Sequence, residues 1–115
     1  FKSINDTYGH DYGDLVLRTL GELLSHGLRT QDLTARWGGE EFLVLLPDTG
    51  AQGGAQVAER LRYRVEAYRF NSRVTVTLGG ATVAPDKTLH TLLREADAAL
   101  YAGKFAGRNC VRWYE

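Results

Sequence analysis

Residues 38–42 of this 115-residue chain read Gly-Gly-Glu-Glu-Phe and stand between two apolar, β-rich runs at 33–37 and 42–46. This arrangement predicts a hairpin that carries two carboxylates at its turn. The glycines allow a tight turn and let a ligand approach the backbone, while the adjacent glutamates supply hard oxygen ligands for a divalent cation. Acidic turns also occur as plain solvated surface, so this segment alone does not decide between a site and a loop.

Three helices are expected to position the hairpin, because apolar residues recur at helical spacing in three segments. The first runs from about Asp11 or Gly13 to Ser25. The second follows a glycine-rich loop through Gly54, and the third runs from about Thr88 to Phe105. The residues expected to be buried are Val16, Leu17, Leu20, Leu23, Leu24, Leu28, Val57, Ala58, Leu61, Val65, Leu89, Leu92, Leu93, Ala96 and Leu100.

Two further strands are expected, at residues 73–78 and 109–114. The first alternates apolar residues with threonines, as a strand does when one face is buried, and Gly79-Gly80 after it indicates a bulge or a close backbone approach. Helices and strands in this order, with the hairpin in the middle, predict an α+β fold in which helices pack on an antiparallel-containing sheet.

Composition argues against several classes of protein. The chain has room for one core, and its 14 lysine and arginine residues balance 14 aspartate and glutamate residues, which disfavours nucleic-acid binding through bulk positive charge. The strands lack the stacking aromatics of a ferredoxin-like RNA-binding module. We expect no membrane span and no signal peptide, and the single Cys110 cannot form an internal disulfide.

Four segments, in order along the chain, resemble motifs of the GGDEF diguanylate cyclase family. They are Phe1–His10 with Gly13-Asp14, Arg36–Phe42, Val74–Gly79, and Ala96–Tyr101 with Lys104 and Gly107–Asn109. The second segment is the family signature in its GGEEF form. The resemblance implies a single domain over residues 1–115 with the family's ferredoxin-like, palm-type fold. Gly103 stands where alanine is usual, which weakens helix propensity by about 1 kcal/mol but removes no functional group.

In the family, a strand that ends in a metal-binding aspartate precedes the position matched by Phe1. We therefore expect the printed sequence to be N-terminally truncated, with that first strand and aspartate outside it. If the aspartate were missing altogether, we expect catalysis to be lost.

The reaction that the resemblance implies is condensation of two GTP into cyclic di-GMP with release of two pyrophosphates. Mg²⁺, or Mn²⁺, is the implied cofactor, with Glu40 as main ligand and candidate proton acceptor and Glu41 as the second metal-proximal carboxylate. Gly38 and Gly39 would let the nucleotide lie against the hairpin. One domain holds one GTP, so the active species is expected to be a homodimer.

Further residues match the family's substrate contacts. Asn5 and Asp14 resemble the pair that reads guanine, Lys2 resembles the catalytic lysine that stabilises charge on the phosphates, and Lys104 with Arg108 resembles the pair that grips the β- and γ-phosphates. Without the family, each has an ordinary structural role. Asn5 would be a cap, Asp14 a helix N-terminal charge, and the lysines solvated surface residues.

Arg29 and Asp32 resemble the family's RxxD inhibitory site for cyclic di-GMP, and Arg60 falls where relatives supply a second arginine. Arginine pairs with guanine O6 and N7 and with phosphate, while aspartate accepts from the N1 and N2 edge. At this spacing, Arg29 and Asp32 would otherwise form a local ion pair worth under about 1 kcal/mol.

Two functions from different classes remain open. The first is an active, product-inhibited diguanylate cyclase, and the second is a non-catalytic module that binds GTP or cyclic di-GMP, especially for a truncated chain. The expected partners are GTP, cyclic di-GMP and a second copy, with no nucleic acid and no membrane contact by this domain. We expect a cytoplasmic bacterial output domain fused to a sensor or receiver domain, whether or not the longer protein is anchored in a membrane.

Overall fold

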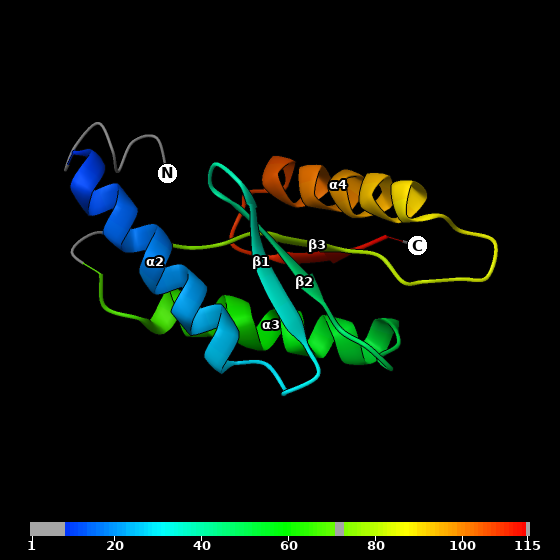
Figure 1. Cartoon of the computed structure of the whole chain (residues 1–115). Helices are drawn as coiled ribbons and strands as arrows, with labels where there is room; N and C mark the ends of the chain where they lie inside the picture. Colours follow the sequence, from blue (N-terminus) through cyan, green and yellow to red (C-terminus); the bar gives the residue numbers. More distant parts are fainter. Residues whose placement is uncertain (1–8, 71–72, 115) are drawn as a thin grey trace. The chain divides into compact units, whose positions relative to one another are not determined.

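The computed structural model describes residues 9–70 and 73–114 (Figure 1). Helices and strands follow one another along this part of the chain, and they divide between two compact units. The first unit comprises Phe1–Pro47 and Tyr68–Arg73, and the second comprises Asp48–Ala67 and Val74–Glu115. The elements are α2 (His10–His26), β1 (Leu33–Gly38), β2 (Glu41–Leu45), α3 (Ala51–Ala67), β3 (Leu78–Gly80), α4 (Leu89–Phe105) and β4 (Val111–Trp113).

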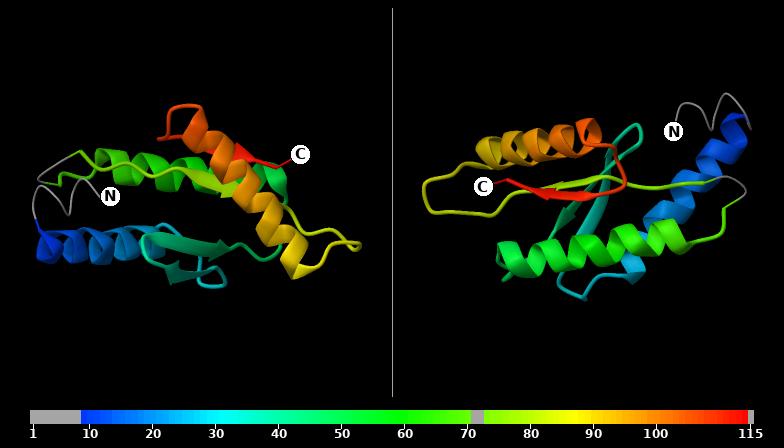
Figure 2. Two further views of the ribbon diagram at one scale, coloured as in Figure 1. Left: turned by 90° about the horizontal axis from the view of Figure 1, so that it is seen from above. Right: turned by 180° about the vertical axis from the view of Figure 1, so that it is seen from behind.

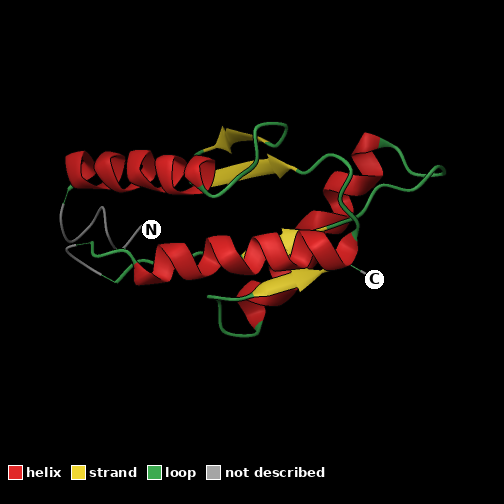
Figure 3. Ribbon diagram, turned by 90° about the horizontal axis from the view of Figure 1, so that it is seen from below, coloured by secondary structure: helices red, strands yellow, loops and turns green. Residues whose placement is uncertain are grey.

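In the first unit, the amphipathic helix α2 packs against the hairpin of β1 and β2 (Figure 3). Its apolar stripe is confirmed in Val16, Leu17, Leu20 and Leu24, which are 0–6% exposed. A Cβ added at Gly21 would lie 3.6 Å from the Phe42 ring, so this glycine brings the helix close to β2. The helix ends at Gly27, as its C-cap.

The antiparallel hairpin is confirmed. Leu33 pairs with Leu45, and the register then runs without a break to the pair of Arg36 and Phe42. Between Arg36 and Gly38 the register shifts, so Trp37 is the extra residue of a β-bulge, and this residue is 61% exposed. The bulge directly precedes the turn and therefore helps to set the direction of the residues at its tip.

In the second unit, strands β3 and β4 pair in parallel, and α3 and α4 both pack on them (Figure 2). Glycines allow this close packing. A Cβ on Gly79 would lie 2.3 Å from the backbone nitrogen of Leu100, so α4 and β3 touch backbone to backbone. A Cβ on Gly80 or Gly54 would meet the indole of Trp113 at 2.3 Å or 2.5 Å. The expected close approach at Gly79-Gly80 is confirmed.

Some boundaries differ from the predictions. Residues 73–77 are not in a strand, and β3 covers only Leu78–Gly80. The opposite segment turns instead of pairing, because Arg108 and Asn109 have φ of 64° and 48° and β4 begins only at Val111. Helix α3 begins at Ala51, before Gly54 rather than after it, and the Gly54 amide already donates to the Gly50 carbonyl at 2.8 Å.

Thr88 caps α4 through its side chain, which accepts from the amide of Thr91 at 3.1 Å. The prediction that Leu89 is buried is wrong, because it lies at the first residue of α4 and is 68% exposed. No described helix is both long and apolar enough to cross a membrane. The predicted α+β fold, with helices packed on short strands and an antiparallel hairpin carrying the acidic turn, is confirmed.

Candidate functional site

The turn between β1 and β2 presents the two signature carboxylates. Gly39 has φ +42°, and Arg36 braces the turn by donating to the Gly39 carbonyl oxygen from Nε at 2.8 Å and from Nη2 at 2.5 Å. Glu40 and Glu41 are exposed, and neither carboxylate has a hydrogen bond or ion pair to any residue that the structure describes. Apart from the glycine and its two chain neighbours, no described residue has an atom within 4 Å of a Cβ added at Gly38 or Gly39, so this part of the chain leaves the turn open.

These two carboxylates suit a hard divalent cation such as Mg²⁺, which takes a few carboxylate oxygens and completes its shell with water and phosphate. Within residues 9–70 and 73–114 no cluster of three or more His, Cys, Asp or Glu side chains is suited to a metal. The carboxylates of Glu40 and Glu41 therefore suit two ligand positions of a metal site. The remaining oxygen ligands would come from the nucleotide, from water or from other protein groups.

The left-handed backbone at Gly39 gives a first prediction. Replacing Gly39 by alanine places a Cβ in a conformation that L-residues rarely adopt and is expected to lower the free energy of unfolding by about 1 kcal/mol. Gly38→Ala is the matched control, since the adjacent position is open and does not have positive φ. Urea unfolding of both variants makes the comparison, and equal stabilities would contradict the turn geometry.

The other predicted active-site residues divide between the two units. Asp14 is exposed on α2 and belongs to the first unit, as the turn with Glu40 and Glu41 does. Lys104 and Arg108 belong to the second unit. Lys2 and Asn5 lie outside the described residues, so their roles stay predictions. An open pocket of about 320 Å³ in the first unit is lined by residues of α2 and the hairpin, and none of the predicted site residues that the structure describes is among them.

The two cationic residues predicted to bind phosphate come together at the end of α4. Lys104 is exposed in its last turn. Arg108 follows in left-handed backbone, its amide donates to the Gly103 carbonyl at 3.0 Å, and its Nη1 donates to the Lys104 carbonyl at 3.2 Å. The structure thus brings two positive side chains to one helix end.

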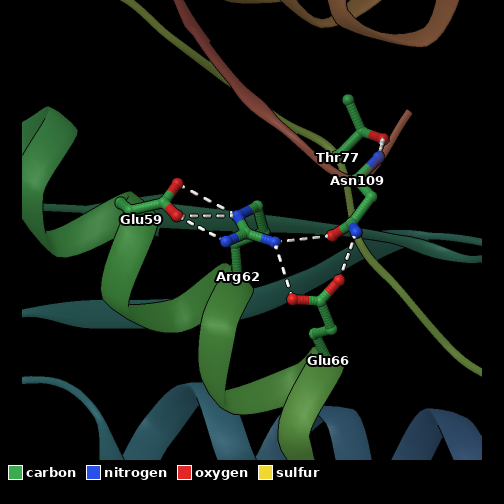
Figure 4. Close-up of polar contacts among 5 residues, drawn as sticks. All are labelled: Glu59, Arg62, Glu66, Thr77 and Asn109. Atoms are coloured by element: carbon green, nitrogen blue, oxygen red, sulfur yellow. Dashed lines mark hydrogen bonds and ion pairs between the residues drawn. The ribbon is translucent and has the colours of Figure 1, made fainter. Parts of the chain in front are cut away.

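A polar network beside this turn was not predicted (Figure 4). Arg62 on α3 bonds to Glu59 and Glu66 on the same helix and donates from Nη1 to Asn109 Oδ1 at 2.8 Å. Hydrogen bonding to Arg62 holds the pKa of Glu59 below its usual value, and the two glutamates raise the pKa of Arg62. The i+3 and i+4 charge spacing on α3 was the available signal, but the sequence does not reveal the contact with Asn109.

The two residues of the predicted inhibitory motif, Arg29 and Asp32, bond to each other. Asp32 has a side chain only 1% exposed, and it accepts from Arg29 Nε at 3.1 Å, from Arg29 Nη2 at 2.9 Å and from the Arg29 amide at 2.9 Å. Arg29 also donates to the Pro47 carbonyl at 3.0 Å. The structure therefore contains the local ion pair in its bidentate form. Arg60 lies exposed on α3, in the other unit.

The chain matches the family model described as diguanylate cyclase, GGDEF domain, over residues 1–110. The chain belongs to the GGDEF family. This match includes all four motifs that carried the resemblance and extends over both compact units.

Among curated relatives, the response regulator PleD of Caulobacter vibrioides is 42% identical over 119 aligned residues, which cover 96% of this chain and 26% of PleD. Diguanylate cyclase A of Treponema denticola is 40% identical, and the match covers 96% of this chain and 32% of that protein. The chain thus spans about a quarter to a third of the length of these two relatives.

Solved GGDEF structures are similar to this one over nearly its whole length. The GGDEF domain of DgcB from Caulobacter crescentus, in complex with c-di-GMP, has a TM-score of 0.95 at 34% identity and covers 99% of this chain and 71% of that chain. The active GGEEF domain of a diguanylate cyclase from Vibrio cholerae has a TM-score of 0.94 at 34% identity, covering 100% of this chain and 76% of that one.

Proposed function

We propose that this GGDEF domain condenses two GTP molecules into cyclic di-GMP, with release of two pyrophosphates. The observation that carries the proposal is the intact Gly-Gly-Glu-Glu turn, whose two carboxylates are exposed and make no hydrogen bond or ion pair with the part of the chain that the structure describes. Membership of the family and the likeness to an active GGEEF domain from Vibrio cholerae support it.

Each residue of the proposed site has a distinct task. Glu40 and Glu41 would hold Mg²⁺ or Mn²⁺, which acidifies a bound hydroxyl and neutralises phosphate charge when present. Glu40 is the candidate acceptor of the 3′-hydroxyl proton. Asp14, with Asn5, would accept from and donate to the edge of guanine.

The cations and glycines complete the proposed site. Lys104 and Arg108 would bind the β- and γ-phosphates through charge-assisted hydrogen bonds, and Lys2 would stabilise charge that develops on the phosphates. Gly38 and Gly39 would let the nucleotide approach the turn, because no side chain stands there.

The reaction requires two copies of the domain. Each 3′-hydroxyl attacks the α-phosphorus of the other nucleotide, so two sites must face one another before either bond forms. Each attack forms one P–O bond and releases one pyrophosphate, and the two attacks close a ring. We therefore propose a homodimer as the active species.

Product inhibition through Arg29, Asp32 and Arg60 is also proposed, supported by the complexes of similar GGDEF domains with c-di-GMP. A ligand that used Asp32 would have to displace Arg29, since their side chains are paired. Binding of cyclic di-GMP without turnover is the second candidate function, and these complexes are the observation in its favour.

The ion pair between Arg29 and Asp32 leads to a prediction for Arg29→Ala. Inhibition by cyclic di-GMP should weaken, but the variant should also lose about 1–3 kcal/mol of unfolding free energy, because the buried Asp32 carboxylate loses its charged partner. Inhibition curves measured beside urea unfolding separate the two effects. Unchanged inhibition in a destabilised Arg29→Ala domain would leave the pair with a structural role alone.

The activity is tested by incubating the full-length protein that carries residues 1–115 with GTP and Mg²⁺. Chromatography separates GTP, linear intermediates and cyclic di-GMP. Formation of cyclic di-GMP is expected. Intact GTP after prolonged incubation, with cyclic di-GMP bound to the protein when added, would favour the receptor function instead.

A further inference from the structure

The turn after α4 has a backbone conformation that its residues do not adopt freely. Gly107, Arg108 and Asn109 have φ of 124°, 64° and 48°, three positive values in succession. Glycine enters this region without cost and asparagine tolerates it, but the Cβ of Arg108 crowds the neighbouring backbone. Such a turn persists only where surrounding contacts hold it.

Asn109 supplies most of these contacts. Its amide donates to Thr77 Oγ1 at 3.1 Å, its Oδ1 accepts from Arg62 Nη1 at 2.8 Å, and its Nδ2 donates to Glu66 Oε2 (Figure 4). Both polar atoms of the side chain are therefore occupied, and they tie the turn to α3.

Arg62 is the least exposed member of the ion pairs in this network and bonds to Glu59, Glu66 and Asn109. Its side chain is 14% exposed, whereas those of its partners Glu59 and Glu66 are 55% and 34% exposed. Glu59 accepts from Nε and Nη2, while Glu66 and Asn109 accept from Nη1. A guanidinium that is bonded by two carboxylates in this way has little freedom to move. It therefore presents Nη1 to Asn109 in one orientation.

We propose that Arg62 and Asn109 are positioning residues that hold the Gly107–Asn109 turn so that Arg108 lies beside Lys104, ready for the terminal phosphates of the nucleotide. This inference rests on the function proposed above. The turn fixes where Arg108 leaves the backbone, and the guanidinium then bonds the Lys104 carbonyl. Neither Arg62 nor Asn109 has to contact the substrate.

The test compares GTP with GMP, which lacks the two phosphates that Arg108 and Lys104 are proposed to bind. Asn109→Gly keeps the left-handed backbone accessible but removes the side chain. Arg62→Lys keeps the positive charge but removes the planar guanidinium that bonds several partners at once. Arg64→Lys, at an exposed position on the same helix, is the matched control. Calorimetric titrations with Mg²⁺ present measure both affinities.

We expect both network variants to weaken GTP binding about tenfold, as the loss of a charge-assisted contact does, and to change GMP binding less than about twofold. The control should match the wild type for both nucleotides. A parallel loss of GTP and GMP affinity, or no change in either, would overturn the inference, because a merely structural role does not distinguish the two ligands.

Amide hydrogen exchange separates this inference from the proposed function. In Arg62→Lys the amides of Arg108 and Asn109 should exchange faster, since the turn they stabilise is released, while those in the middle of α2 should not change. If the wild type bound neither nucleotide, the proposed function would fail, and unchanged exchange at these two amides would overturn the positioning role independently.

Discussion

Replacing Glu40 by glutamine is expected to reduce formation of cyclic di-GMP by at least about 100-fold, the scale of loss when a group that stabilises transition-state charge is removed. The substitution keeps the size of the side chain and removes its charge. Glu40 is exposed at the hairpin turn and pairs with no other described residue, so its charge is not needed there to hold the fold. The domain should remain folded while its turnover is lost.

Asp86→Asn is the matched control for this prediction. It makes the same chemical change in an exposed turn of the second unit, and activity should stay within about twofold of the wild type. The rates are compared at saturating GTP and Mg²⁺, with circular dichroism to verify folding. Full activity of Glu40→Gln would remove this residue from the metal site.

Gly79→Ala is expected to produce the largest loss of stability of any single change considered. The added Cβ would lie 2.3 Å from the Leu100 nitrogen and 2.5 Å from the Ala96 carbonyl oxygen, and both are backbone atoms of α4. Because neither can move as a flexible side chain does, helix and strand must separate. Overpacking of this kind is expected to cost about 3 kcal/mol.

Gly50→Ala provides the control, because beyond its two chain neighbours no residue that the structure describes has an atom within 4 Å of the Cβ that it would add, and its φ is not positive. Chemical unfolding of the two variants should therefore differ by most of the cost predicted for Gly79→Ala. A Gly79→Ala domain as stable as the Gly50→Ala domain would show that α4 and β3 do not touch in the way that the structure describes.

The elements that local patterns specify were predicted well. The stripe of Val16, Leu17 and Leu20 predicted α2, and the glycines at the turn between two apolar runs predicted the hairpin. The bounds expected for the strand at 73–78 were wrong, because β3 covers only Leu78–Gly80 and the segment opposite residues 73–77 turns at Asn109 instead of pairing. The alternation of apolar and polar residues within one segment does not reveal which distant segment it pairs with.

Long-range packing also explains the roles of two glycines, which local sequence patterns do not reveal. From the sequence, Gly103 is only a weak helix former, but a Cβ there would lie 2.8 Å from Thr77 Cγ2 and 3.3 Å from Cys110 Sγ, so its small size allows close packing. The sequence predicts a loop through Gly54, whereas Gly54 lies inside α3 against Trp113. In both cases the reason is a contact with a segment far away in the chain.

For the candidate site, the signature and the family motifs predicted which side chains to consider, and their roles stay predictions. The sequence could not show that Asp32 is buried and already paired with Arg29, or that Arg62 reaches Asn109 across 47 residues. Such contacts depend on how helices and loops meet in three dimensions, which no local spacing specifies.

The most direct test of the proposed metal and nucleotide site is a crystal structure of the domain with Mg²⁺ and a non-hydrolysable GTP analogue. We expect a metal ion about 2.1 Å from a carboxylate oxygen of Glu40, with the guanine edge against Asp14 and the terminal phosphates at Lys104 and Arg108. A bound nucleotide with Glu40 directed into solvent, away from metal and phosphates, would contradict it.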